Sequence, residues 1–267
     1  MQIFIIPNTQ MKMRRHKKIA SVAKPLISLL FWLALWYILS VIVGKELLLP
    51  SPFTVFNKLL NLAVMSDFWI SIALSLLRIF CGCAVGILLG LIFAILASAF
   101  DIADTFISPL MRTVRATPVA SFIILVLLWA GRNFVPTIIS AMMVTPVVYT
   151  SMRSSICQTA PDLLEMARAF RFGRIKTLRL IYIPSSLSAF QSSCMNAVGL
   201  SWKSGVAAEV LCLPSGAIGT RLYYAKLYLE TGELFAWTAI VIILSFILER
   251  LFRLALNQLS KKVPKYD

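Results

Sequence analysis

Acidic side chains and histidine are scarce in this chain of 267 residues. It has 11 aspartates and glutamates together and one histidine, His16, and charged residues of both signs make up only 14% of the sequence. A soluble globular domain has about 25% charged residues. Metal centres and acid–base catalytic sites need clustered histidine, cysteine or acidic residues, and the sequence shows no such cluster. We therefore expect no catalytic and no metal-binding residues.

Two further features are missing. The five cysteines are an odd number in apolar segments, which is not a disulfide framework, and we interpret them as small core residues. The phosphate-binding pattern G-x-x-x-x-G-K-[ST] does not occur, because WKSG (202–205) lacks the preceding glycines. ATP hydrolysis is therefore not expected from this chain, and we expect it to bind no cofactor of its own.

Long apolar segments dominate what is present. Hydrophobic residues make up 59% of the chain, and a helix needs about 20 mostly apolar residues to cross a bilayer. Charge-free windows occur at 25–44, 79–100, 116–131, 133–152, 180–202 and 234–248. The second should begin near Trp69 and include a structural Arg78, and the fifth should continue to Leu211. These windows predict an all-α polytopic membrane protein with six transmembrane helices.

The basic residues indicate its orientation. If the N-terminus is cytoplasmic, the inner segments 1–24, 101–115, 153–179 and 250–267 hold six, two, six and five bases, nineteen of the 26, and the outer segments hold five. Cytoplasmic loops are enriched in lysine and arginine, so both termini are predicted to be cytoplasmic. This distribution explains the net charge of +15 without nucleic acid. We expect tails at 1–24 and 256–267 around a membrane domain at 25–255.

Apolar and glycine residues also recur at helical spacing in other parts of the chain. Residues 49–64 carry apolar side chains at helical spacing and should form an outer interfacial helix. Residues 212–233 should form a turn and a short outer helix. Gly82, Gly86 and Gly90 lie on one helix face, where a second helix could approach closely; packing within one bundle is the preferred interpretation over a sliding helix.

A basic segment, EMARAFRFGRIKTLRLIYIP (165–184), interrupts the apolar chain. Thr159 could cap a helix here, and the pattern predicts two short helices with a bend near Arg171–Gly173. Their apolar stripes are Leu163, Met166, Ala167 and Phe170, then Ile175, Leu178 and Tyr182. Such stripes could lie on the inner leaflet with the bases at lipid phosphates, or they could dock into a partner protein. Periodicity alone leaves both open.

The same segment resembles the cytoplasmic coupling loop of ATP-binding-cassette importer permeases, whose pattern is E-A-A, a glycine, then I-x-L-P. Glu165, Ala167, Ile181 or Ile183, and Pro184 match this pattern. Other stretches resemble permeases of the nitrate, sulfonate and taurine type over about 45–255: LPSP (49–52), SLLRIFCGCAVGILLGL (75–91), LLWAGRNFVPTIISAMMVTPVVYTSM (127–152) and SGVAAEVLCLPSGAIG (204–219). Two departures are Met166 at the first alanine and Arg171 at the usual glycine position, with Gly173 two residues later.

The resemblance implies a type I importer permease fold in the bacterial cytoplasmic (inner) membrane and a set of partners. A cytoplasmic ATPase dimer, which binds the ATP, would dock on the loop 153–184. A second permease copy would complete the pathway as a homodimer with this chain, and an extracytoplasmic binding protein would deliver the solute. The implied docking residues are Glu165, Ala167, Phe170, Arg171, Gly173, Arg174 and Pro184. The implied solute is a nitrate-, sulfonate- or taurine-like anion or a thiamine-precursor-like heterocycle.

Some residues within the spans are candidates for the translocation pathway. Lys203 lies in a predicted span, where a lysine usually faces a cavity or a partner. It could attract an anionic solute, or it could snorkel to the surface or pair with Glu209 on this chain or its copy; the structural roles are preferred. The other candidates are Met142, Met143 and Thr145.

Two rival classes fit the sequence less well than an importer. An ATPase-independent secondary transporter or channel should carry acidic relay residues in its spans, and only Glu209 qualifies. A membrane-embedded enzyme should carry a catalytic cluster, which the sequence lacks. The sequence therefore favours a transport subunit that depends on another chain for ATP hydrolysis.

Overall fold

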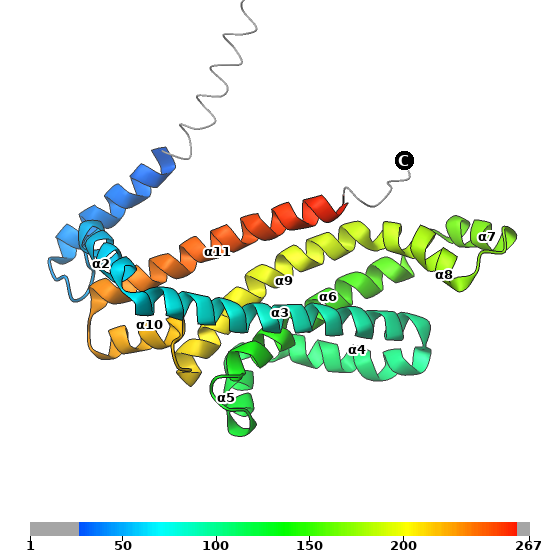
Figure 1. Cartoon of the computed structure of the whole chain (residues 1–267), viewed down its shortest axis with the longest axis horizontal. Coiled ribbons are helices and arrows are strands. Elements are labelled where there is room, and N and C mark those ends of the chain that lie inside the picture. Colours follow the sequence, from blue (N-terminus) through cyan, green and yellow to red (C-terminus); the bar gives the residue numbers. More distant parts are fainter. Residues whose placement is uncertain (1–26, 261–267) are drawn as a thin grey trace, which may run out of the picture.

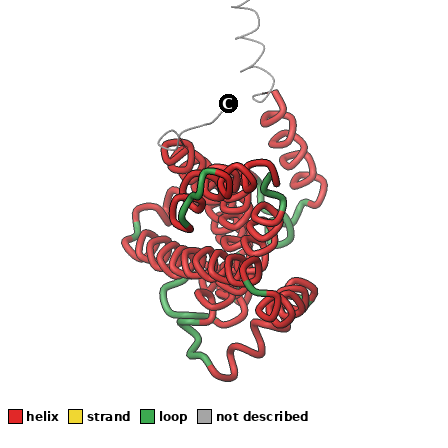
Figure 2. Tube along the Cα trace, turned by 90° about the vertical axis from the view of Figure 1, so that its right-hand side faces the viewer, coloured by secondary structure: helices red, strands yellow, loops and turns green. Residues whose placement is uncertain are grey.

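The computed structural model describes residues 27–260, and that part of the chain consists of helices and connecting loops (Figures 1 and 2). It begins with the helix Ile27–Val43. The later helices are α2 (Pro52–Val64), α3 (Ser66–Ala99), α4 (Asp101–Ala116), α5 (Val119–Trp129), α6 (Val135–Cys157), α7 (Pro161–Ala169), α8 (Arg174–Thr177), the π-helix Leu178–Tyr182, α9 (Ile183–Cys212), α10 (Ile218–Leu227) and α11 (Thr231–Ser260). The all-α prediction is confirmed. The expected tail 1–24 and residues 261–267 of the expected tail 256–267 lie outside the described residues, and α11 continues past the expected domain end at 255.

Apolar length supports part of the predicted set of spans. Within residues 27–260, α3 and α6 are long and apolar enough to cross a membrane, and α4 with α5 would add a third if that bent pair counts as one span. The helix Ile27–Val43 is apolar but shorter, and α9 contains many serines. The count of six spans and the positions of the termini stay predictions.

The centre of the molecule is the contact between α3 and α6. A Cβ atom added at Gly82, Gly86 or Gly90 would lie only 2.2 to 2.8 Å from a carbonyl oxygen of α6, those of Thr137, Ala141 and Thr145 in turn. The residue numbers of the contacting pairs increase together along α3 and α6, so the two helices run parallel. The predicted close approach at the glycine face is confirmed, and it lies within one bundle.

Helix α9 runs antiparallel to α3 and is hydrogen-bonded to the N-terminal half of α3. Glu209 is fully buried, and its Oε2 accepts hydrogen bonds from the Ser75 hydroxyl at 2.8 Å and from the Gly219 N–H at 3.1 Å. The Ser75 hydroxyl in turn accepts a bond from the Ile218 N–H. Arg78 donates to the Ser215 carbonyl, which supports its expected structural role. These bonds join α3, α9 and the start of α10.

The expected third span, 116–131, is wrong in its form. The apolar window is split at Thr117 and Pro118, and α5 has 11 residues and lies at 108° to α4. At 1.5 Å per residue such a helix reaches about 16 Å, roughly half the hydrocarbon thickness. Helix α4 occupies the segment expected to be a cytoplasmic loop. Figure 1 shows α4 beside α3 and α5 turning away from the long axis.

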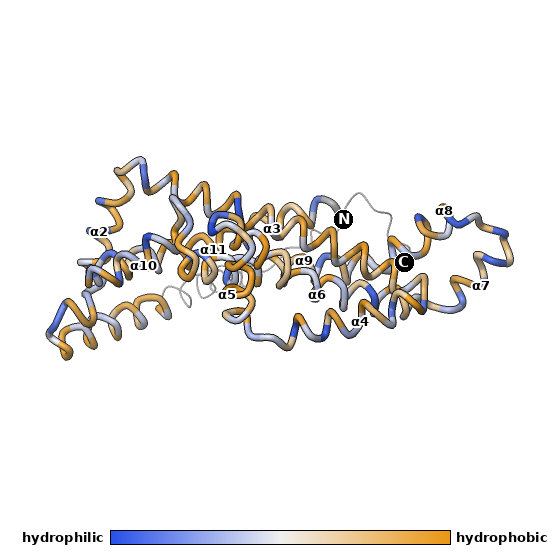
Figure 3. The backbone as a smooth tube through the Cα atoms, turned by 90° about the horizontal axis from the view of Figure 1, so that it is seen from below, coloured by the Kyte–Doolittle hydropathy of each residue, from blue (hydrophilic) through white to orange (hydrophobic). Residues whose placement is uncertain are grey.

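The two ends of the long axis carry the shorter helices. Helices α2 and α10 lie at one end and α7 and α8 at the other (Figure 1). The predicted helices in 49–64 and 212–233 are confirmed as α2 and α10. In Figure 3 the tip formed by α7 and α8 mixes hydrophilic and hydrophobic residues. This is the end that the charge distribution predicts to be cytoplasmic.

Candidate functional site

The loop between α6 and α9 is the first candidate site. It holds α7 and α8, joined by a tight turn in which Arg171 has φ +50°. The Arg171 N–H donates to the Arg168 carbonyl and the Phe172 N–H to the Ala167 carbonyl, which is the Schellman pattern that ends helices, usually with glycine at the left-handed residue. The bend predicted near Arg171–Gly173 is confirmed.

The position of the bend shows which residue of this loop takes the place of the family's glycine. The left-handed residue is Arg171, six residues after Glu165, where the resembling family usually has glycine. Gly173 has φ −67° at the N-cap of α8, and a Cβ atom there would have no neighbour within 4 Å. The loop therefore keeps the bend in the family position and forms it with an arginine.

The apolar stripe of α7 is divided between two sides. Leu163, Met166 and Phe170 are exposed, Phe170 by 71%, and Ile175 on α8 is exposed by 82%. Ala167 is buried at 4%. The structure therefore presents Phe170 and its neighbours outward, and it uses Ala167 to hold α7 against the chain.

The remaining loop residues surround this apolar surface. Glu165 and Arg174 are exposed, and Pro184 lies half-buried in the first turn of α9. Lys176 places its ammonium group 4.2 Å from the centre of the Phe172 ring. The expected cap at Thr159 is wrong, because Ala160 precedes α7 without a side-chain bond and the Thr159 hydroxyl donates to the Ser155 carbonyl instead.

The predicted pathway residues do not come together. Met143 and Thr145 are buried in the chain, and the Thr145 hydroxyl donates to the Ala141 carbonyl at 2.7 Å. Met142 is half-buried. Lys203 is exposed on α9 and lines a cavity of about 370 Å³ with Glu249 and Arg253 of α11. Glu209 is buried with Ser75, away from Lys203.

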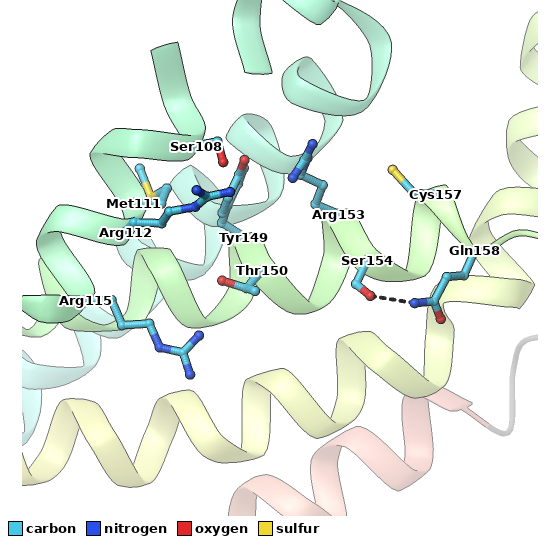
Figure 4. A pocket seen from close by; sticks show the side chains of 10 residues that line it. All are labelled: Ser108, Met111, Arg112, Arg115, Tyr149, Thr150, Arg153, Ser154, Cys157 and Gln158. Atoms are coloured by element: carbon cyan, nitrogen blue, oxygen red, sulfur yellow. Dashed lines mark hydrogen bonds between the residues drawn. The ribbon is translucent and has the colours of Figure 1, made fainter. Parts of the chain in front are cut away.

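A larger basic cavity was not predicted. It has a volume of about 470 Å³, lies between α4 and α6, and contains Arg112, Arg115 and Arg153 (Figure 4). Arg153 pairs with Asp104 at 2.5 Å. The sequence assigned Arg112 and Arg115 to a loop because they are charged, although the amphipathic pattern of 101–116 could have indicated a helix.

A third cavity, of about 550 Å³, lies between α6 and α9. Its polar lining consists of hydroxyl and amide side chains: Ser151, Ser154, Ser155, Gln158, Thr159, Ser185, Ser188 and Ser192. It shares Ser154 and Gln158 with the basic cavity. Within residues 27–260 no group of three or more histidine, cysteine or acidic side chains could hold a metal ion.

Comparisons with known proteins agree with this architecture. The chain is 24% identical over 237 residues to the putative aliphatic sulfonates transport permease protein SsuC of Bacillus subtilis (strain 168), covering 88% of this chain and 86% of that protein. It is 23% identical to the taurine transport system permease protein TauC of Escherichia coli (strain K12), covering 86% and 84%. It is 25% identical to the bicarbonate transport system permease protein CmpB of Synechococcus elongatus, covering 80% of each.

Solved structures share the fold. An amino acid ABC transporter crystallised with histidines matches with a TM-score of 0.56 at 17% identity, over 70% of this chain and 90% of that one. The inward-facing MetNI methionine ABC transporter matches with a TM-score of 0.53 at 16% identity, over 74% and 94%. Residues 86–263 match the family model described as the binding-protein-dependent transport system inner membrane component. The chain therefore belongs to the family of inner membrane components of binding-protein-dependent transport systems.

Proposed function

We propose that this chain forms the translocation pathway of an importer and is driven by a separate ATP-binding-cassette ATPase, which docks on α7 and α8. The observation that carries the proposal is the exposed apolar surface of that loop, centred on Phe170. Helices as short as α7 and α8 are marginal in water on their own, and a partner groove would cover their apolar side chains. Family membership favours this mechanism over a self-sufficient transporter or channel.

The assignment extends to the other partners. A second copy of this chain would complete the pathway as a homodimer, an extracytoplasmic protein would deliver the solute, and the ATPase dimer would bind the ATP. We assign Glu165, Arg171, Arg174 and Pro184 to the docking loop with Phe170. Ala167 and Gly173 shape the loop, since one is buried and the other begins α8.

The solute is a small molecule with an acidic group. Relatives are named for the transport of aliphatic sulfonates, taurine and bicarbonate, and each of these carries a negatively charged oxyanion group in neutral water. Lys203 and the arginines between α4 and α6 are basic groups on open surfaces that suit such a solute. A thiamine-precursor-like heterocycle is the alternative from the wider resemblance.

Co-purification tests the docking surface. The tagged chain, solubilised gently from native membranes, should bring down a phosphate-loop ATPase, and Phe170→Asp should reduce the recovered ATPase at least tenfold, because a buried charge would replace an apolar contact. Phe53→Asp is the matched control, since Phe53 on α2 is also 71% exposed and lies at the other end of the molecule.

The outcome separates docking from folding. Both variants should reach the membrane at the level of the unchanged chain, and only Phe170→Asp should lose the ATPase. Full recovery of the ATPase with Phe170→Asp would contradict the proposal. Ala167→Glu is a poorer probe, because it would place a charge at a buried position and disturb the loop itself.

A further inference from the structure

Helix α4 brings basic side chains back along the inner half of the molecule. It begins one residue after α3 ends and runs antiparallel to α6, where Asp104 contacts both Arg153 and Tyr149. Arg112 and Arg115 lie further along α4, on the cavity that Thr150 also lines. Figure 4 shows Arg112 pointing toward Tyr149, Arg153 further along α6, and Arg115 on the other side of the α6 ribbon in this view. These arginines therefore lie beside a long helix, which a cytoplasmic loop would not achieve.

Together these three arginines carry a net positive charge. Asp104 compensates Arg153 at 2.5 Å, whereas Arg112 and Arg115 have no carboxylate within 4.0 Å among the described residues. Both are exposed. Arginine presents several N–H donors in a plane that matches oxyanions, so the two free guanidinium groups are suited to a small anion.

The basic cavity lies next to the serine-lined cavity. Ser154 and Gln158 line both, so the two cavities adjoin at α6, one with arginines and the other with hydroxyl groups, and together we call them the basin. The polar wall extends along the exposed face of α9 through Asn196 to Lys203. A membrane-facing helix surface would be apolar, and this one is not.

We propose that this basin is an inner-half binding site for a small oxyanion group, a sulfonate or carboxylate, which Arg112 and Arg115 hold by charge and the serines hold by hydrogen bonds. The inference rests on the proposed importer function, since the anion is the transported solute on its way to the cytoplasm. A phospholipid headgroup offers the same oxyanion chemistry. The serine side chains between α6 and α9 favour the solute, because their hydroxyl groups can donate hydrogen bonds to a small oxyanion that reaches them.

A native cysteine reports on the site. The expectation that all five cysteines are core residues is wrong for Cys81 and Cys157, which are exposed, whereas Cys83, Cys194 and Cys212 are buried. Cys157 lines the basic cavity. The full chain with Cys81→Ser would be placed in phosphatidylcholine discs and treated with an anionic or a cationic thiol reagent, the sulfonatoethyl and trimethylammonioethyl methanethiosulfonates. Mass spectrometry of the Cys157 peptide gives the rate of labelling by each reagent. The ratio of the anionic to the cationic rate is then divided by the same ratio measured for a small thiol in solution.

The proposal predicts a preference for the anionic reagent. Arg112→Gln and Arg115→Gln should each lower the normalised ratio about threefold at low salt, and 1 M salt should remove most of the preference. Arg132→Gln, which removes an exposed arginine outside this cavity, should leave the ratio unchanged. Millimolar methanesulfonate should slow labelling of Cys157 in the unchanged chain and not in the Arg112→Gln, Arg115→Gln double variant.

Other results would overturn the proposal. An unchanged ratio in both single variants would show that the arginines do not attract anions to the cavity. Slower labelling with added phosphatidylglycerol, but not with methanesulfonate, would assign the basin to lipid. Neither result depends on the ATPase, so the co-purification experiment can succeed while this inference fails.

Discussion

Arg171 occupies a left-handed backbone position that glycine usually takes. A side chain at positive φ costs about 1–2 kcal/mol, and the structure holds Arg171 there by the paired bonds to Arg168 and Ala167 that end α7. The turn sets the angle at which Phe170 is presented. This backbone strain therefore lies in the turn that orients Phe170, the centre of the proposed docking surface.

Replacing this arginine should stabilise the turn. Arg171→Gly removes the steric cost, less the extra chain entropy of glycine, so local opening of the turn should become harder by roughly 0.5–1 kcal/mol. Hydrogen exchange at the Phe172 amide, which donates to the Ala167 carbonyl, measures this directly. Gly173→Ala is the control and should be neutral, because the added Cβ meets no atom within 4 Å. Faster exchange at Phe172 in Arg171→Gly would contradict the assigned strain.

At the scale of helices, the apolar windows predicted the extents of α3, α6 and α9 well, and Pro146 lies inside α6 without ending it. The window 116–131 failed at Pro118. A proline disfavours helical backbone in the preceding residue, and Thr117 has ψ 134°. A charge-free window predicts that a segment lies in lipid, but it does not distinguish one straight helix from two helices joined at a bend.

The same reasoning explains why the basin was missed. Arg112, Arg115 and Ser154 fall in segments expected to be cytoplasmic loops, whereas Ser151 and Ser188 fall in apolar windows. Only the return of α4 along α6 brings these side chains together. Short polar side chains scattered along several helices leave no local pattern, so such a site emerges from the tertiary structure alone.

The contact between α3 and α6 should tolerate no added side chain. Gly82→Ala places a Cβ atom 2.2 Å from the Thr137 carbonyl oxygen, so the helices must separate and lose packing over several turns. The free energy of unfolding should fall by about 1–3 kcal/mol, as for other overpacked sites. Thermal unfolding in detergent measures the loss, with Gly131→Ala as the control, since its nearest atom is 4.0 Å away. Equal stability of the two variants would contradict the close contact.

At the scale of the whole molecule, the charge distribution and the arrangement of the helices favour the same orientation in the membrane. The loop with α7 and α8 lies at one end of the long axis and the α2 and α10 helices lie at the other (Figure 1). The excess of bases in the expected inner segments predicts that the α7–α8 end is cytoplasmic. An ATPase on that side can then act on α6 and α9, which flank the loop and line the basin.

Site-specific cross-linking at the tip tests the central claim most directly. A photoreactive amino acid at position 170, in cells that express the chain at its normal level, should cross-link to a phosphate-loop ATPase, and the same amino acid at position 53 should not. Mass spectrometry of the purified adduct identifies the partner. Cross-links from position 170 to lipid alone, with no ATPase adduct, would show that α7 and α8 lie on the membrane and would contradict the coupling of this chain to ATP hydrolysis.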